Sequence, residues 1–415
     1  MSTTGSAERR AQRAFLEGEG IVRLAPTWVP RTFGRPAGRL RLHPDDHRAL
    51  GAHRGAIVER WLASTTPADN GPLTPPGEGL SMVVSEDRWG TSLTPLRDAI
   101  AASGVEYLGA ASWSKDGGWP VLTKFFDYAD GLPFHLHQDD ARAGLVGRRG
   151  KPEAHYFPAQ MNPHYGTFPY AFLGLAPGVT EDQVRSRLER LGSGETRITE
   201  LSLGYRLRTG TAWDVPPGVL HGPGSLCTYE PQRASDVFAM LERVAGADVL
   251  PESAVWKDAP TDRHGDVEYL LELIDWEKNP DPTFTAHRFM EPIDLVPVDD
   301  QPDAGFVDRW IVYRSGDFSA KELTVRPGRE ITISDPGAYG LVVIAGHGRI
   351  GVHEAAATVS SRFGQLTSDE FFVGYGTATS GVRISNGSRT DDLVLLRHFG
   401  HGPEMPGAAG APVRL

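Results

Sequence analysis

The chain has 415 residues, with 48 glycines, 32 prolines and a 40% hydrophobic fraction, which predicts a turn-rich, mainly β protein rather than a helical bundle or a disordered chain. A formal net charge of −11 gives no support for a nucleic acid or an anionic membrane surface as a partner. The single cysteine cannot form an intrachain disulfide, and no apolar run approaches the ~18 residues of a membrane helix, so we expect a cytoplasmic protein.

The first part of the chain predicts a β-rich domain that follows a short tail. Residues 1–20 are polar and predict a flexible N-terminal tail. Residues 21–279 form the first expected domain, in which the run from Trp119 to Tyr128 is strand-like. The turn Asp130-Gly131 then leads into another expected strand.

Helical patterns interrupt this domain at about 153–200 and 235–279. The capping-box sequence Thr180-x-x-Gln183 marks the start of one helix. The segments 235–244 and 266–276 also carry apolar residues at helical spacing. We therefore expect a small helical insertion in an otherwise β domain.

A second β domain is expected beyond a proline-rich stretch. Residues 280–304 contain several prolines and predict a linker, because proline interrupts both helices and sheets. Residues 305–415 then contain apolar runs of strand length, such as 340–344 and 393–396.

Three short motifs in the first domain carry residues that bind metals. The expected strand after Gly131 contains His135 and His137, whose side chains point to the same face because strand side chains alternate. Lys151-Pro152-Glu153 follows, and Gly210-x5-Pro216-x-Gly218-x2-His221 lies further on. Three imidazoles and one carboxylate suit a divalent transition metal.

These motifs resemble those of a known superfamily. The Gly210 to His221 motif is similar to the second metal motif of cupins, and His135-x-His137 is similar to the first. The carboxylate lies 16 residues beyond His137, inside Lys151-Pro152-Glu153, and this spacing resembles class I mannose-6-phosphate isomerases. In that family a Gln-x-His pair, a Lys-Pro-Glu and a later histidine bind zinc. The segment Glu230 to Asp236 and the triplet Glu59-Arg60-Trp61 resemble further family segments.

The resemblance implies a mainly β chain made of two cupin, or jelly-roll β-barrel, domains with a small helical insertion. The second domain contains His347 and His353. No Pro-x-Gly-x-x-His motif follows them, so we expect a degenerate C-terminal cupin domain that holds no metal.

The chain also departs from the family pattern. His135 stands where the family has its glutamine ligand, and Gln138 replaces a proline. The family's arginine after Ser-Asp is missing, because residues 237–240 occupy that place; Arg243 or Arg233 are candidate substitutes. That arginine helps the family to bind its phosphorylated substrate. Its absence here leaves both a sugar phosphate and a sugar without phosphate as candidate substrates.

The resemblance implies a metal-dependent aldose–ketose isomerase that acts through a cis-enediol. One divalent ion, with Zn²⁺ favoured over Mn²⁺ or Fe²⁺, is expected on His135, His137, Glu153 and His221. The expected catalytic residues are Lys151, which contacts a substrate oxygen, and Glu230 or His155, which carry the proton. Arg233 and Tyr156 are the expected substrate-binding residues.

Two other functions remain open for this sequence. Three histidines and one glutamate are also the ligands of cupin dioxygenases and decarboxylases. A sugar-binding cupin without catalytic activity is the other alternative. In each sugar-related case the expected partner is a small-molecule sugar or sugar phosphate, with no nucleic acid and no membrane, and a homodimer is an open option.

Overall fold

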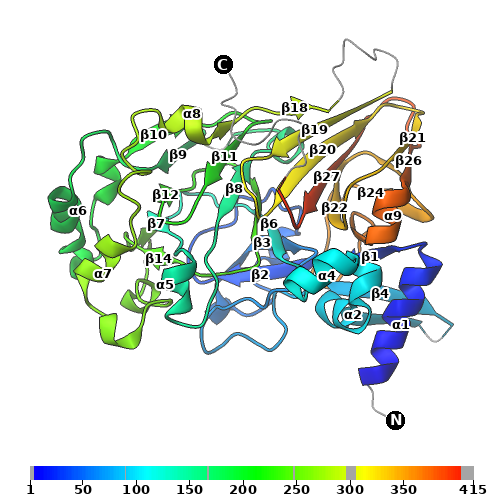
Figure 1. Cartoon of the computed structure of the whole chain (residues 1–415), viewed down its shortest axis with the longest axis horizontal. Helices are drawn as coiled ribbons and strands as arrows, with labels where there is room; N and C mark the ends of the chain where they lie inside the picture. Colours follow the sequence, from blue (N-terminus) through cyan, green and yellow to red (C-terminus); the bar gives the residue numbers. More distant parts are fainter. Residues whose placement is uncertain (1–3, 89, 166–167, 246–247, 296–304, 403–415) are drawn as a thin grey trace.

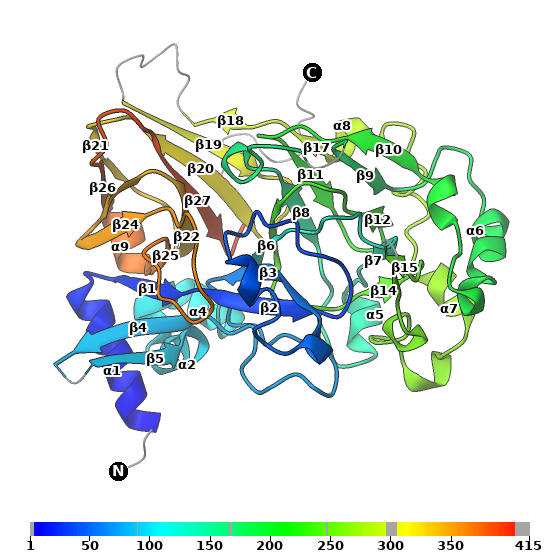
Figure 2. The same cartoon turned by 180° about the vertical axis from the view of Figure 1, so that it is seen from behind.

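The computed structural model describes residues 4–88, 90–165, 168–245, 248–295 and 305–402. Four antiparallel sheets form the body of the protein, arranged as two double-sheet units side by side (Figure 1). Most of the short helices lie at the outer ends of the two units, as the reverse view in Figure 2 also shows. The structure therefore confirms a mainly β chain.

The first unit pairs a seven-stranded sheet with a five-stranded sheet. In spatial order the larger sheet contains β17 (Phe289–Met290), β11 (Ala212–Val215), β8 (Glu153–Tyr156), β13 (Thr228–Arg233), β6 (Val121–Phe126), β3 (Ala56–Leu62) and β2 (Thr27–Arg31). The smaller sheet contains β10 (Leu203–Arg206), β9 (Tyr170–Leu173), β12 (His221–Gly222), β7 (His135–Leu136) and β14 (Ala239–Met240). A small ribbon, β15 (Val244–Ala245) with β16 (Asp248–Val249), follows β14.

The second unit pairs a nine-stranded sheet with a four-stranded sheet. The larger sheet contains β18 (Ile293–Asp294), β19 (Phe306–Val312), β20 (Ser319–Val325), β27 (Leu393–Phe399), β22 (Tyr339–Ala345), β25 (Glu370–Val373), β1 (Ile21–Ala25), β4 (Met82–Asp87) and β5 (Gly90–Pro95). The smaller sheet contains β21 (Glu330–Ile333), β26 (Val382–Asn386), β23 (His347–Ile350) and β24 (His353–Ala356).

The N-terminal segment crosses between the two units. Strand β1 pairs with β25, which lies near the other end of the chain, and β2 begins at Thr27 in the sheet of the first unit. The first unit therefore does not contain all of residues 21–279, because β1, β4 and β5 extend the sheet of the second unit.

Helix α1 (Thr4–Glu17) occupies most of the segment expected to be a flexible tail, frayed or loosely helical. Its residues Ala11 and Phe15 are four positions apart, share one helix face and are buried. The Phe15 ring stacks on Tyr107, with 4.3 Å between the ring centroids. This contact anchors the helix against α3 (Gly104–Leu108), and α1 also packs on α2 (Leu96–Ala102) and on strands β4 and β5. Helix α4 (Ala110–Asp116) follows α3 and packs on it.

Two of the expected helices are present and one is absent. Helix α6 (Glu181–Leu188) begins with the predicted capping box, and α7 (Val267–Glu272) lies inside the predicted 266–276 segment. The segment 235–244 is not helical, because Met240 pairs with His135 of β7 and the pairing of β14 overrides the helical spacing. The remaining helices are α5 (Asp140–Gly144), α8 (Phe284–Arg288) and α9 (Tyr375–Ser380).

The expected linker is partly structured. Helix α8 and the strands β17 and β18 lie within residues 280–295, and residues 296–304 lie outside the described part of the chain. No helix in the described ranges is both long enough and apolar enough to span a bilayer.

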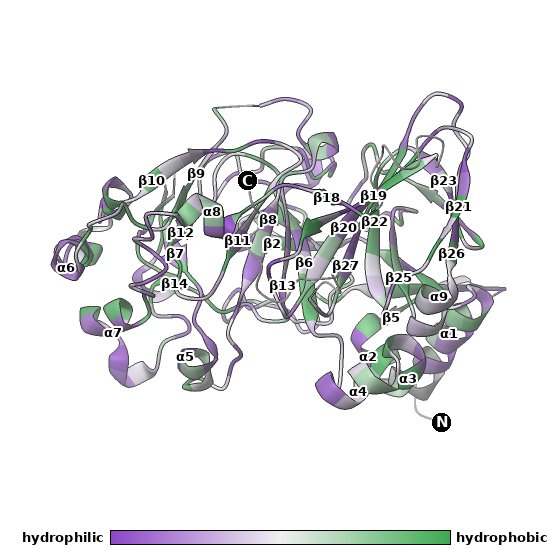
Figure 3. Ribbon diagram, turned by 45° about the horizontal axis from the view of Figure 1, so that its top comes forward, coloured by the Kyte–Doolittle hydropathy of each residue, from purple (hydrophilic) through white to green (hydrophobic). Residues whose placement is uncertain are grey.

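The two units share a hydrophobic core. Phe125 and Tyr229 on the seven-stranded sheet belong to the same buried cluster as Val312 and Leu396 on the nine-stranded sheet. Figure 3 shows apolar colouring along the strands of both units, whereas the outer helices carry hydrophilic segments. One face of the seven-stranded sheet therefore packs on the second unit, which leaves its other face to meet the five-stranded sheet.

Candidate metal centre and sugar cleft

Three histidines meet on the inner face of the five-stranded sheet. Strands β7 and β12 are neighbours, and His135 is paired directly with His221. The turn before β12 requires Gly218, which has φ +79° and donates its backbone N–H to the carbonyl of His137 at 2.8 Å. This hydrogen bond holds the His-x-His segment beside the strand that carries His221.

Each of these imidazoles has its Nδ1 atom bound to a backbone carbonyl. Nδ1 of His135 lies 2.7 Å from the Pro133 oxygen, and Nδ1 of His137 lies 2.7 Å from the Val237 oxygen. Nδ1 of His221 lies 2.9 Å from its partner oxygen, at position 219. Because a carbonyl only accepts, Nδ1 carries the proton in all three rings and the Nε2 lone pair is available to a metal.

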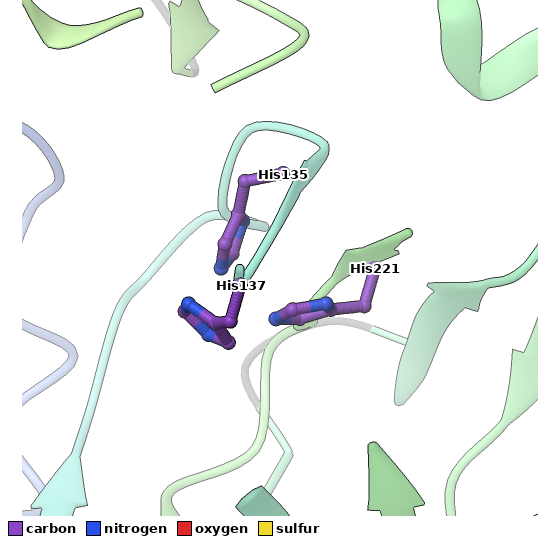
Figure 4. A group of neighbouring side chains, drawn as sticks. All are labelled: His135, His137 and His221. Carbon is purple, nitrogen blue, oxygen red and sulfur yellow. The ribbon is translucent and has the colours of Figure 1, made fainter. Parts of the chain in front are cut away.

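The three rings lie close together and are buried (Figure 4). Their centroids are 4.1 Å apart for His135 and His221, 5.0 Å for His137 and His221, and 5.4 Å for His135 and His137. Burial lowers the pKa of His137 to about 4 and holds that of His135 well below its ordinary value. These two rings are therefore neutral at pH 7, as metal ligands must be.

The carboxylate of Glu153 faces this cluster from β8 of the opposite sheet. Its Oε2 lies 2.9 Å from Nε2 of His137 and 2.8 Å from the Lys151 ammonium. Its Oε1 lies 3.1 Å from Nε2 of His221 and 2.8 Å from Nε2 of His155. Burial opposes ionisation of Glu153, but His137, Lys151 and His155 outweigh it and keep its pKa well below the ordinary value.

The donor set fits a divalent metal ion. The Nε2 atoms of His137 and His221 and the Oε2 atom of Glu153 are buried and lack hydrogen-bond geometry, although they approach one another closely. The ligand atoms of His135, His137 and His221 lie within 4.8 Å of one another, and so do those of Glu153, His155 and His221. Lone pairs that converge without bonding one another are the arrangement that a metal requires.

The inner face of the seven-stranded sheet continues from Glu153 as a row of alternating charges. Glu230 of β13 is paired directly with Lys124 of β6, and the ammonium lies 3.2 Å from the carboxylate. Glu59 of β3 lies 3.8 Å from the same ammonium and forms two hydrogen bonds with Arg31 of β2, at 2.9 and 3.0 Å. Opposite charges on neighbouring strands stabilise this face.

These charged groups line a narrow cleft beside the histidines, with a volume of about 50 Å³. Aromatic rings form another wall: Phe33 stacks on Tyr128 with 6.3 Å between centroids and an interplanar angle of 5°, and Phe126 lies next to Tyr128. Asp236 and Phe238, which follow β13, complete the side opposite the rings.

The structure brings seven of the nine predicted site residues together and places two elsewhere. Tyr156 and Arg233 lie on the outward faces of β8 and β13, because alternation puts Glu153, His155 and Glu230 on the inward faces. The Tyr156 hydroxyl donates to Glu322 at 2.7 Å, and Arg233 pairs with Asp140 and Asp317. Tyr156 and Arg233 therefore lie outside the candidate site, contrary to the expectation.

Neither candidate substitute for the missing arginine reaches the cleft. Arg233 faces outward, and Arg243 donates to the backbone carbonyls of Leu250 and Leu191. Sequence reasoning missed Arg31 and Lys124, which do line the cleft. Their signal was weak, because Lys124 is a single basic residue in an expected strand and Arg31 lies in a segment for which no element was predicted.

Among the described residues, the second unit holds no group of histidines and carboxylates at metal-binding distances. His347 is exposed on β23, and Nε2 of His353 donates to the backbone oxygen of Ile21 at 3.0 Å.

Comparison with known proteins agrees with this architecture. The sequence matches no protein-family model and no curated protein. The structure resembles mannose 6-phosphate isomerase from Bacillus subtilis, with 14% identity, a TM-score of 0.60 and 92% and 99% of the two chains covered. It also resembles a single-site mutant of phosphomannose isomerase from Salmonella typhimurium, with 12% identity, a TM-score of 0.58 and 92% and 100% coverage. A zinc-bound mannose 6-phosphate isomerase gives the same four values. The chain therefore shares the overall fold of these mannose 6-phosphate isomerases at low sequence identity.

Proposed function

We propose that this protein is a metal-dependent aldose–ketose isomerase that acts on a small sugar through a cis-enediol. The observation that supports this most is the juxtaposition of three imidazoles, each with a free Nε2 atom, and the carboxylate–ammonium group formed by Glu153, Lys151 and Glu230. Isomerisation needs an electrophile beside the oxygens of two neighbouring sugar carbons and a base that can reach both of these carbons. A metal ion on the imidazoles would supply the electrophile, and a carboxylate of the cleft would supply the base.

The metal would be held by His135, His137, Glu153 and His221. Zinc is the ion we propose, with manganese or iron as alternatives, because imidazole and carboxylate ligands suit all three. The ion would supply Lewis-acid stabilisation of the negative charge that develops on the sugar oxygens.

Glu230 is the proposed base. Burial and the neighbouring Glu153 raise its pKa, but Lys124, Lys151 and His155 more than offset them, so its pKa lies below the ordinary value and the carboxylate is ionised at neutral pH. It would remove the proton from the carbon beside the carbonyl and return it to the adjacent carbon. Its Oε1 atom makes no hydrogen bond within the protein, but it lies 3.2 Å from the Lys124 ammonium and 3.4 Å from the Lys151 ammonium, which would hold it in place to accept this proton.

Lys151 and His155 would orient the reacting groups. The Lys151 ammonium lies between Glu153 and Glu230, at 2.8 and 3.4 Å, and can donate to a sugar oxygen bound beside them. His155 lies 3.6 Å from Glu230, close enough to share its proton during transfer between carbons. Burial opposes protonation of His155, but Glu153 and Glu230 raise its pKa to about 9.

The test is proton exchange with solvent. The zinc-loaded protein is incubated in D₂O with a panel of aldoses and aldose phosphates, and NMR follows both ketose formation and deuterium at the carbon beside the carbonyl. We expect turnover with deuterium incorporation, and a loss of at least 100-fold in Glu230→Gln. The control Asp214→Asn, whose carboxylate pairs with Arg288 outside the cleft, should retain activity. No exchange with any sugar would reject the proposal.

A dioxygenase or decarboxylase remains the second candidate, because His135 gives the site a third imidazole where the isomerases have glutamine. Iron in the purified protein and oxygen consumption with an organic substrate would favour that function. Sugar binding that survives His137→Ala, with no turnover of any sugar, would instead indicate a binding protein.

A further inference from the structure

We propose that the cleft selects a neutral sugar over a sugar phosphate, and that Glu59 determines this selectivity by occupying Arg31. The inference rests on the proposed function and names its substrate class. The observation behind it is that each arginine and lysine lining the cleft is already paired with carboxylates.

Arg31 is the only arginine among the described residues that line the cleft, and its guanidinium is fully used. Nε and one terminal nitrogen donate to the two oxygens of Glu59 at 2.9 and 3.0 Å. That nitrogen also donates to Asp236 at 3.3 Å, and the other donates to Asn70 at 2.8 Å and to Asp236 at 3.5 Å. These bonds account for all five N–H groups of an arginine. No donor is left for the two-pronged contact by which arginine binds phosphate.

The two lysines of the cleft are held between carboxylates. Lys124 lies 3.2 Å from Glu230 and 3.8 Å from Glu59, and Lys151 lies 2.8 Å from Glu153 and 3.4 Å from Glu230. An anion that reached either ammonium would meet these carboxylates at similar distances. Hydroxyl groups meet no such repulsion, because they can donate to a carboxylate and accept from an ammonium.

The backbone offers no alternative phosphate site. Phosphates commonly bind the free N–H groups at the start of a helix. The residues that line the cleft come from strands and the loops beside them, and none of these described residues lies in the first turn of a helix. A phosphate could enter only by displacing a buried carboxylate from its cation, and a buried charge left without its partner is strongly unfavourable.

The same cleft is well suited to a neutral sugar. The stacked rings of Phe33 and Tyr128 offer an apolar surface to the C–H face of a sugar. Glu230 has a buried oxygen that makes no hydrogen bond within the protein, and it can accept from a sugar hydroxyl group. The cleft therefore combines an apolar wall with hydrogen-bond acceptors, and its cations are neutralised by neighbouring carboxylates.

Equilibrium binding separates the two substrate classes without relying on turnover. Calorimetry on the zinc-loaded full chain would compare a linear hexitol with the same hexitol carrying a terminal phosphate, since neither can isomerise. We expect the hexitol to bind at least tenfold more tightly than its phosphate. In Glu59→Gln, which releases donors of Arg31, this preference should fall at least tenfold. Asp214→Asn is the control outside the cleft and should keep the wild-type preference.

The wild-type comparison decides the selectivity for a neutral sugar even if Glu59→Gln fails to fold. An unchanged preference in a folded Glu59→Gln would overturn the role of Glu59. Tighter binding of the phosphate than of the hexitol would overturn the inference. Turnover of aldose phosphates alone would also overturn it, while leaving the proposed isomerase intact. If neither ligand binds and no sugar exchanges its proton, the proposed function fails together with the inference.

Discussion

Arg31→Met should destabilise the protein strongly, and the effect should depend on pH. The substitution leaves Glu59 and Asp236 buried without their guanidinium partner. Burial opposes ionisation of Glu59, but Arg31 and Lys124 lower its pKa from 4.5 to about 2. That difference corresponds to about 3 kcal/mol of folding stability. Independently of this pKa, removing one partner of a buried ion pair generally costs about 3–5 kcal/mol of folding stability. We therefore expect a loss of about 3–5 kcal/mol at pH 7.

Urea unfolding at two pH values tests this reasoning. The pKa of Glu59 is depressed in the folded state, so its stabilisation is complete above pH 4.5 and is lost as the pH falls toward 2. At pH 3.5 the difference between wild type and variant should be about 1 kcal/mol smaller than at pH 7. The matched control is Arg35→Met, which breaks an exposed pair with Asp130 and should cost less than about 1 kcal/mol. A loss below about 1 kcal/mol for Arg31→Met, or one that does not shrink in acid, would refute the paired-charge account of the cleft.

Three further substitutions test other parts of the structure. His137→Ala should abolish binding of one equivalent of zinc by elemental analysis, whereas His347→Ala, on an exposed strand of the second unit, should not; equal metal content would contradict the site. Tyr156→Phe should cost about 1–3 kcal/mol in urea unfolding, because it leaves Glu322 without its donor, yet should keep metal and sugar binding. A tenfold loss of sugar binding in this variant would contradict the position of Tyr156 outside the cleft. Thr180→Ala removes the cap of α6 and should cost about 1 kcal/mol, and an unchanged unfolding midpoint would show that the cap contributes nothing.

The convergence of the three candidate metal-binding histidines could be predicted, because each lies in a short motif whose local geometry sets the direction of its side chain. Two histidines at i and i+2 on a strand share a face, and the Pro-x-Gly turn places His221 at the start of the next strand. The same alternation rule applied to β8 and β13 would have placed Tyr156 and Arg233 outward once Glu153 and Glu230 were placed inward. Tyr156 and Arg233 were predicted to bind the substrate because they lie close in sequence to Glu153 and Glu230, but on a strand such neighbours can point to opposite faces.

The rest of the cleft could not be predicted from the sequence, because its contacts join distant segments. Arg31 and Asp236 are 205 positions apart, and nothing near either residue indicates the other. The packing of helix α1 on the rest of the protein was not predicted, for a different reason. Its mostly polar composition concealed the pair Ala11 and Phe15, whose spacing of four residues is enough to anchor a helix against a partner surface.

The position of the second unit explains why a double sheet without metal ligands matters to the candidate site. Strands β8 and β13 carry Glu153, His155 and Glu230 on one face, and their other face packs on the second unit. There the Tyr156 hydroxyl donates to Glu322 of β20, and the Tyr229 hydroxyl lies 2.9 Å from Nδ1 of His398 on β27.

The side chains of both tyrosines and of their two partners are buried, so these hydrogen bonds are shielded from water. They fix the position of β8 and β13 on the face that points away from the candidate site. A reacting group must be held within a fraction of an ångström, and strands supported on both faces hold it better than strands exposed on one. The second unit thus supports the sheet that carries the carboxylates. We expect that the first unit on its own would not keep the geometry of the site.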